Sequence, residues 1–208
     1  MAKGGSGGSA LVRVNARGEY IASVTKRTTP GTNGTTTIEA QISLDQIPVP
    51  DRRYAADVAY LNYDGDGEAV QIAFGQRAVA SSTLRSAVVV KVYPDHVRKF
   101  LAGNDTFRPQ LFGYLARAKA TVPPMGRLCE EPGHVVSLVA NILSVGYTAR
   151  EAVVDLYHYN ALALAKLNTG SDLAIEPVLR VDLPTTVLAA LVGALNTLSA
   201  ELPPEILL

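Results

Sequence analysis

The chain has 208 residues, of which 48% are hydrophobic and 18% are charged, a balance typical of a folded globular protein. Its 19 basic and 19 acidic side chains cancel, which disfavours a generally basic nucleic-acid-binding protein. No apolar run reaches the roughly 18 residues of a membrane-spanning helix, and residues 1–10 lack the apolar stretch of a secretory signal. The single cysteine, Cys129, cannot form an internal disulfide, so we expect a reduced, cytoplasmic setting.

The charges are unevenly distributed along the chain. Residues 1–128 carry 16 basic and 10 acidic side chains, whereas residues 129–208 carry 3 and 9. Opposite net charges favour docking of the two halves on each other or head-to-tail association of copies. The alternative is that the charge varies along the sequence without any such association.

The first part of the chain predicts a flexible Gly/Ser tail at 1–10 and a β-rich unit at 11–121. A hairpin is predicted around Asp64-Gly65-Asp66-Gly67, because glycine supplies the positive φ of a tight turn. Helices are predicted at 94–103, which begins at a proline, and at 108–119. The predicted strands, from alternating or β-branched residues, are 11–14, 19–25, 37–44, 53–63, 68–74 and 83–93.

A Pro/Gly-rich linker at 122–133 separates this unit from a second α+β unit at 134–208. Apolar segments at 135–145, 148–159 and 175–183 precede a helix that follows Pro184. The apolar positions of this helix are spaced to form one broad stripe.

The two parts repeat one order of elements: strand, turn, strand, loop, strand, helix. Glu68-Ala69-Val70 matches Glu151-Ala152-Val153, and Pro94, Val97 and Leu101 match Pro184, Val187 and Leu191. Three strands and one helix cover only one sheet face, so two copies would pack together. We therefore expect an α+β fold of antiparallel sheets with helices on one face, as a tandem pseudo-dimer. Chance similarity between short strand–Pro–helix patterns is the alternative.

This pattern resembles a family of small bacterial proteins of unknown function. The segments that carry the resemblance in the first copy are Tyr54-Ala55, Glu68–Gly75, Val88–Val92 and Pro94–Leu101. In the second copy they are Ala140-Asn141, Glu151–Leu156, Val178–Leu183 and Pro184–Leu191. The first copy lacks the family's Asn and the second lacks its Phe-Gly. The resemblance covers about half of the chain and implies a fold, with no catalytic residues. More loosely, the sheet-plus-helix arrangement is similar to export chaperones, which bind unfolded chains on apolar grooves.

Residues with metal-binding or catalytic chemistry are few. Asp64, Asp66 and Glu68 could form part of a calcium loop, but a hairpin turn accounts for them better. Five further residues are of types that bind metals: Cys129, Glu130, Glu131, His134 and His158. Zinc sites usually need two close pairs of ligands, and here Cys129 and His134 form only one loose pair. His96 is interpreted as exposed at a helix N-terminus. No nucleophile elbow, P-loop or dinucleotide motif occurs, so we expect a non-enzyme without catalytic, cofactor or metal residues.

We therefore expect a protein-binding or assembly protein that recognises a protein partner or itself. The candidate interface residues are Val187, Leu191, Leu195 and Leu198 on the last helix, and the 19–25 strand is a candidate unpaired sheet edge. One alternative is a chaperone-like binder of unfolded chains. Another, disfavoured, is a single-strand nucleic-acid binder. Its contacts would come from the basic 77–127 segment, at Arg77, Arg85, Lys91, Arg98 and Lys99, beside Tyr54, Tyr60, Tyr63 and Tyr93.

Overall fold

A computed structural model describes residues 12–30, 36–63, 69–78, 84–127, 133–166 and 172–202. Its strands and helices form an α+β fold, as expected. The chain divides into unit 1, Met1–Val49 with Tyr159–Pro177, and unit 2, Pro50–His158 with Val178–Leu208. The boundary expected at 122–133 therefore lies inside unit 2, because strand pairing joins segments that the sequence separates.

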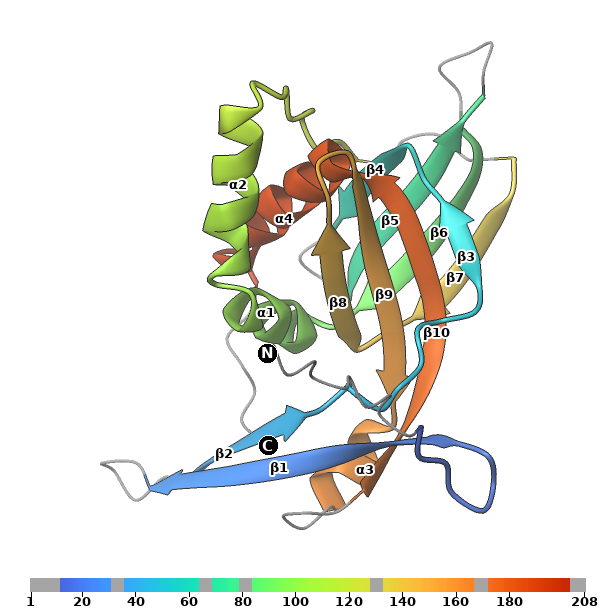
Figure 1. Ribbon diagram of the computed structural model, residues 1–208, viewed down its shortest axis with the longest axis vertical. Coiled ribbons are helices and arrows are strands. Elements are labelled where there is room, and N and C mark those ends of the chain that lie inside the picture. Colours follow the sequence, from blue (N-terminus) through green and yellow to red (C-terminus); the bar gives the residue numbers. More distant parts are fainter. Residues whose placement is uncertain are drawn as a thin grey trace, which may run out of the picture. The chain divides into compact units, whose positions relative to one another are not determined.

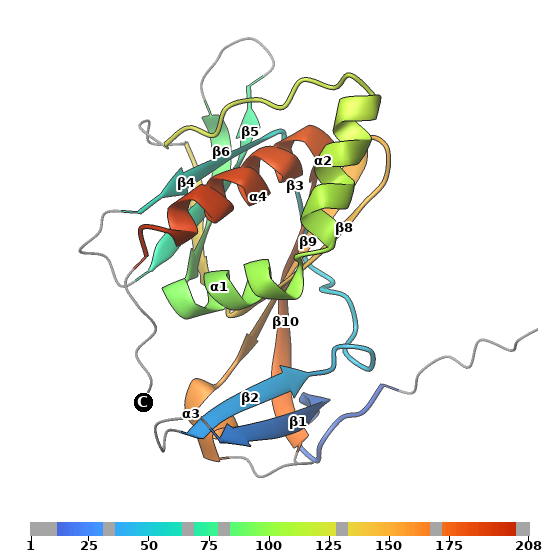
Figure 2. The ribbon, with the colours of Figure 1, turned by 90° about the vertical axis from the view of Figure 1, so that its left-hand side faces the viewer.

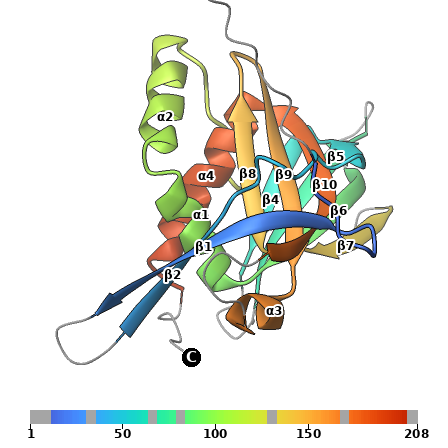
Figure 3. The same ribbon diagram turned by 60° about the horizontal axis from the view of Figure 1, so that its bottom comes forward.

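Unit 1 contains a long antiparallel strand pair and a short helix. β1 (Tyr20–Pro30) pairs with β2 (Thr36–Ile42) through its second half (Figure 3), and through its first half with the start of β10 (Asp172–Pro184). The helix α3 (Ala161–Lys166) begins after Asn160, whose side-chain oxygen accepts hydrogen bonds from two backbone N–H groups. The expectation of an unpaired edge at 19–25 is wrong, since β1 lies between β2 and β10 in the strand order.

The first sheet of unit 2 has the order β4-β5-β6-β7 (Figure 1). β4 (Val58–Asn62), β5 (Val70–Arg77) and β6 (Leu84–Val92) form an antiparallel meander, which confirms the predicted hairpin. The turn Asp64–Gly67 itself lies outside the described residues. The edge strand β7 (Val135–Val139) pairs parallel with β6, which the expectation of antiparallel sheets did not include.

The second sheet of unit 2 has the order β3-β10-β9-β8. β8 (Ile142–Tyr147), β9 (Glu151–Tyr159) and β10 form another meander, with β8 and β9 antiparallel. β3 (Arg53–Ala55) lies at the edge and pairs parallel with β10. Each sheet therefore has a short edge strand from the other part of the sequence: β7 follows β6 in the first sheet, and β3 precedes β10 in the second.

Three helices cover one side of these two sheets (Figure 2). α1 (Pro94–Gly103) packs against β8, and α4 (Thr185–Ser199) packs against β4, while α1 and α4 contact each other. α2 (Phe107–Arg117) packs on α4. Pro94 suits the first position of α1, where its missing N–H has no intrahelical partner to lose. Among the described residues, none of the helices combines the length and the hydrophobicity that a membrane-spanning helix requires.

The core of unit 2 lies between the sheets and this helical layer. Alternate strand residues point into it, among them Ile72, Phe74 and Val90, all 0% exposed. The four candidate interface residues of α4 also lie in this core: Val187, Leu191, Leu195 and Leu198 are 7%, 2%, 0% and 9% exposed. Val187, Leu191 and Leu195 are therefore covered within their own chain, whereas Leu198 also lines a groove described below.

Gly75 follows Phe74 within β5, where the three strands of the meander pack closely. A Cβ atom at this position would lie 2.8 Å from Cδ2 of Leu84 and 3.1 Å from Cγ2 of Val58. Both neighbours belong to the strands that flank β5. A side chain at this position would therefore require the Leu84 and Val58 side chains to shift.

The side of the second sheet that faces away from the core carries two ion pairs. Asp155 and Arg180 form a bidentate pair, with both N–O distances 2.7 Å, and their side chains are 10% and 22% exposed. The hydrogen bond to Asp155 raises the pKa of Arg180. Arg53 on β3 forms a second, more exposed pair with Asp182 at 2.7 Å. The two pairs link three adjacent strands.

Removal of the Asp155 carboxylate should leave a half-buried guanidinium without its counter-charge. We expect Asp155→Asn to lower the free energy of unfolding by roughly 2 kcal/mol, measured by urea denaturation. The matched control is Asp172→Asn, whose partner Arg13 is paired at 2.7 Å with both side chains 45% exposed; it should cost less than about 1 kcal/mol. Equal losses in the two variants would contradict a structural role for the Asp155 pair.

Candidate functional site

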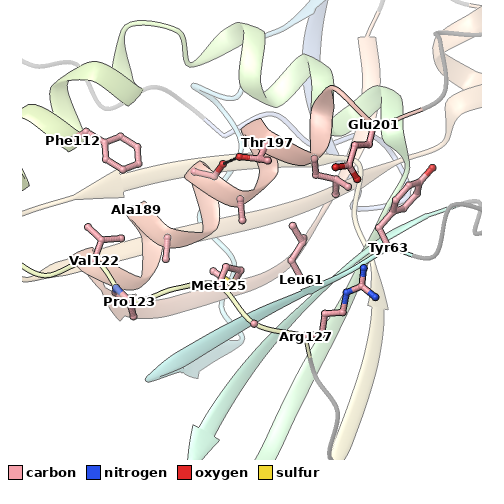
Figure 4. Close-up of a pocket in the computed structure, with 15 residues that line it drawn as sticks. Leu61, Tyr63, Phe112, Val122, Pro123, Met125, Arg127, Ala189, Thr197 and Glu201 are labelled. Carbon is pink, nitrogen blue, oxygen red and sulfur yellow. Dashed lines mark hydrogen bonds between the residues drawn. The ribbon is translucent and has the colours of Figure 1, made fainter.

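An open apolar groove of about 510 Å³ runs along α4 in unit 2 (Figure 4). Its α4 wall consists of small side chains together with Leu198, and the opposite wall is the extended segment 122–127, with Leu61 of β4 between them. Phe112 of α2 and Val122 lie at one end, and Tyr63, Arg127 and Glu201 lie at the other. The lining residues on α4 are Ala189, Ala190, Gly193, Ala194, Thr197 and Leu198.

The wall opposite α4 is fixed by its contact with the edge of β4. The N–H of Leu61 donates to the carbonyl oxygen of Gly126 at 3.1 Å, and Tyr60 forms an isolated parallel bridge with Gly126. Pro123 and Pro124 favour an extended backbone and lack the N–H of a regular strand. The segment therefore borders the groove without becoming a full strand of the sheet.

The middle of the groove presents little polar chemistry. The Thr197 hydroxyl donates to the carbonyl oxygen of Gly193 at 3.2 Å, which turns its polar atom toward its own helix (Figure 4). The charged lining residues are Arg127 and Glu201, both at the same end. Such a surface suits apolar groups and offers no cluster of cations to a phosphate backbone.

The groove is long enough for a short extended peptide. The lining residues on α4 span Ala189 to Leu198, which at the helical rise corresponds to roughly 14 Å. An extended chain advances about 3.3 Å per residue, so about four residues fit along the helix. The groove is open along its length, which also suits a segment within a longer chain.

A second cavity of about 630 Å³ lies near the turn between β8 and β9. Its lining includes Arg53, Arg150, Glu151 and Asp182, with Tyr147 beside them. Arg53 and Asp182 already form an ion pair, which satisfies these two groups within the chain. The cavity therefore carries more charged side chains than the groove, where only Arg127 and Glu201 are charged.

The structure does not bring the five candidate nucleic-acid contacts onto one surface. Arg77 and Arg85 lie where β5 ends and β6 begins, and Lys91 lies at the far end of β6, roughly 20 Å from Arg85 along the strand. Arg98 and Lys99 belong to α1, in the helical layer. Arg98 pairs with Asp95 at 2.9 Å.

The four tyrosines considered with these residues do not form a stacking platform. The Tyr54 hydroxyl donates to the backbone oxygen of Ser86 at 3.0 Å and lies 2.9 Å from its hydroxyl. Tyr60 lies beside Gly126, and Tyr63 lines the apolar groove. Tyr93 lies beside His96, with ring centroids 6.4 Å apart.

His96 is half-buried, so the expectation of an exposed side chain is wrong. Its ring meets that of Tyr93 edge to face. Burial lowers the pKa of His96 to about 4, and Lys99 and His158 act in the same direction against the opposing effect of Asp95. A neutral histidine at the start of α1 is the result.

The metal-type residues give no centre in the part of the chain that the structure describes. No group of three or more His, Cys, Asp or Glu side chains there could hold a metal ion. Cys129, Glu130, Glu131, Asp64, Asp66 and Glu68 lie outside the described residues.

Of the groove residues, the sequence indicates only Leu198, as a candidate interface residue, and Tyr63, as a candidate stacking residue. α4 contains no charged residue, and its apolar stripe is broader than one buried face requires. Leu188, Leu191 and Leu195 enter the core, Gly193, Ala194 and Thr197 line the groove, and Ala189 and Leu198 belong to both. The opposite wall, residues 122–127, could not be predicted from the sequence, because these residues are distant from α4 in the chain and come close to it only in the folded structure.

Comparison with known proteins gives no relative from which a role could be transferred. No family model, curated protein or solved structure matches the chain.

The low pKa of His96 should appear in the pH dependence of stability. Between pH 6.5 and about 4 the unfolded chain takes up a proton at this histidine that the folded chain does not, so stability falls as the pH falls through this range. We expect His96→Gln to flatten this fall, measured by urea unfolding at several pH values. His134→Gln is the control, because His134 is exposed. The same pH slope in wild type and His96→Gln would contradict the burial of His96.

Proposed function

We propose that the chain is a non-enzymatic, cytoplasmic protein-binding protein whose groove along α4 holds an extended polypeptide segment with apolar side chains. The observation that carries this proposal is the apolar groove formed by a helix without a charged residue. In an ordinary surface helix, polar and charged residues cover the face opposite the core. The small side chains of α4 instead form an open wall that apolar side chains can fill.

We further propose that unit 2 is a tandem pseudo-dimer, in which β4-β5-β6-α1 and β8-β9-β10-α4 are related copies. Matching hydrogen bonds support this. The N–H of Ala56, just after β3, donates to the carbonyl oxygen of Asp182 at 2.8 Å. The N–H of Ala140, just after β7, donates to the carbonyl oxygen of Lys91 at 3.1 Å. β3 and β7 thus enter the opposite sheet in the same register.

The next residues of each copy repeat this correspondence. The N–H of Asp57 donates to the carbonyl oxygen of Gly75, and the N–H of Asn141 donates to that of Tyr157, both at 3.0 Å. These pairs start the equivalent hairpins β4–β5 and β8–β9. These paired backbone contacts support two related copies over chance similarity of two short sequence patterns.

The alignment of the two copies by hydrogen bonds differs by one residue from the alignment by sequence, which matches Pro94 with Pro184. Lys91 corresponds to Asp182, so Pro94 corresponds to Thr185 rather than to Pro184. In this register Val97 corresponds to Leu188, and the two side chains are 1% and 0% exposed. Pro94 and Pro184 are therefore one position apart in the alignment of the two copies and are not equivalent residues.

The same register strengthens the case for the groove. Ala189 and Ala190 of α4 correspond to Arg98 and Lys99 of α1. The helix face that carries charge in one copy is thus apolar and lines a groove in the other. A difference confined to one of two matched helices supports a specialised role for the α4 face.

A chaperone-like function would use the same groove, and it differs from a dedicated interaction only in how many sequences bind. The nucleic-acid alternative lacks comparable support, because its basic residues are dispersed over two layers of unit 2. Polypeptide binding is therefore the property to test first.

The test is fluorescence anisotropy with a labelled decapeptide of alternating Leu and Ser, and with a partner peptide in which Asp replaces Leu. We expect the Leu peptide to bind the wild-type chain and Ala194→Glu to weaken this binding at least tenfold, because the carboxylate enters the apolar groove. The matched control is Asn196→Glu, which adds the same charge to an exposed α4 position outside the groove; its affinity should stay within twofold of wild type.

Three further measurements separate the alternatives. The apolar residues Ile206–Leu208 of the chain could compete with the peptide for the groove. A shortened chain that ends at Leu202 lacks this competitor, so it must still bind the Leu peptide. Binding of a reduced, alkylated unfolded protein with the same loss in Ala194→Glu supports a chaperone-like use of the groove. Equal affinity in both Glu variants, no preference for Leu over Asp, or salt-sensitive binding of oligo(dT) alone would overturn the proposal.

A further inference from the structure

The edge strand β7 carries an unusual amount of exposed apolar surface. Val135, Val136 and Val139 are 47%, 40% and 44% exposed, and β7 has no charged residue. It is the last strand of its sheet (Figure 1), and among the described residues its strand partner is β6 alone. Exposed apolar edges of this kind are prone to pair with further strands.

The backbone groups that point to the open edge follow from two hydrogen bonds. The N–H of Ala87 donates to the carbonyl oxygen of His134 at 2.8 Å, and the N–H of Ala140 donates to the carbonyl oxygen of Lys91 at 3.1 Å. Residues at even positions from 134 to 140 therefore direct their backbone groups to β6. Because directions alternate along a strand, Val135, Ser137 and Val139 direct theirs to the open edge.

The corresponding edge of the second sheet is protected. β3 is only three residues long, and the side chain of Arg53 on it is 63% exposed. The carbonyl oxygen of Ala55 already accepts a hydrogen bond from the Gln76 side chain at 2.6 Å. Short length, charge and a satisfied carbonyl all hinder strand addition. β7, in the matching place, has none of these three features among its described contacts.

The sequence of β7, Val-Val-Ser-Leu-Val, reads nearly the same in both directions about Ser137. We propose that the β7 strands of two copies pair antiparallel about a two-fold axis at Ser137, which joins their four-stranded sheets into one continuous sheet. In this register Val135 of each copy lies opposite Val139 of the other, and the outward backbone groups of the three odd positions meet as hydrogen-bonded pairs.

The register also keeps like charges apart. Lys91 neighbours Val139 across β6 and β7, whereas Ala87 neighbours Val135. Since Val139 would face Val135 of the second copy, Lys91 would lie in line with an alanine rather than with the other Lys91. The second copy therefore fits this edge in shape, hydrogen bonding and charge.

Sedimentation over a hundredfold concentration range tests the proposal. Wild type should reach twice its monomer mass of 22.0 kDa. Ser137→Lys should weaken dimerisation at least tenfold, because it places two lysines together at the axis. Ser137→Pro should do the same, because it removes an outward N–H while leaving the bonds to β6. Ala55→Lys on β3 is the matched control and should dimerise like wild type.

Disulfide trapping gives an answer that does not depend on weakened variants. In a Cys129→Ser background, Ser137→Cys should form a cross-linked dimer on mild oxidation, since hydrogen-bonded antiparallel partners lie about 5.5 Å apart at Cα. Ala55→Cys in the same background should stay monomeric. A wild-type monomer at every concentration, or a dimer unaffected by both Ser137 variants and not trapped by Ser137→Cys, would overturn the proposal. Ala194→Glu should dimerise normally, which separates this test from that of the groove.

Discussion

The parallel pairing of two short strands holds unit 2 together. β3 pairs with β10, and β7 pairs with β6, so each sheet is completed by a strand from the other part of the sequence. The helices cross in the same sense, since α1 packs against β8 and α4 against β4. Separation of the two parts of the sequence would therefore remove an edge strand from each sheet. This exchange explains why a boundary placed at 122–133 from composition does not separate compact units.

The proposed groove depends on this exchange. α4 reaches β4 because the helices cross between the two sheets, and the 122–127 segment lies beside β4 because the chain must return from α2 to begin β7. The helix then meets the core with large side chains and the open groove with small ones. An apolar helix that would be costly to expose in isolation is thereby covered on one side and left accessible on the other.

Local sequence signals predicted the elements well and their partners poorly. The proline that begins α1, the alternation in β2 and the turn residues between β4 and β5 act over a few residues, so the sequence shows them directly. The parallel pairs β3–β10 and β7–β6 join residues far apart, and no local period encodes them. The short α3 was missed, since the six residues Ala161–Lys166 carry too little periodicity. The candidate interface residues of α4 lie in the core of unit 2, and an apolar stripe alone does not reveal which neighbouring element covers it.

The strand exchange has a consequence for how the chain is made. β3 contains residues 53–55, but its partner residues in β10 are 180–182. During synthesis β3 must therefore wait until more than a hundred further residues have emerged, which takes on the order of ten seconds at ribosomal speed. β7 meets β6 much sooner, and its valine-rich edge is formed before the second sheet can be complete. The nascent chain thus passes through a stage in which an apolar edge is present and half of its fold is absent, a stage at which slow, non-local pairing competes with aggregation.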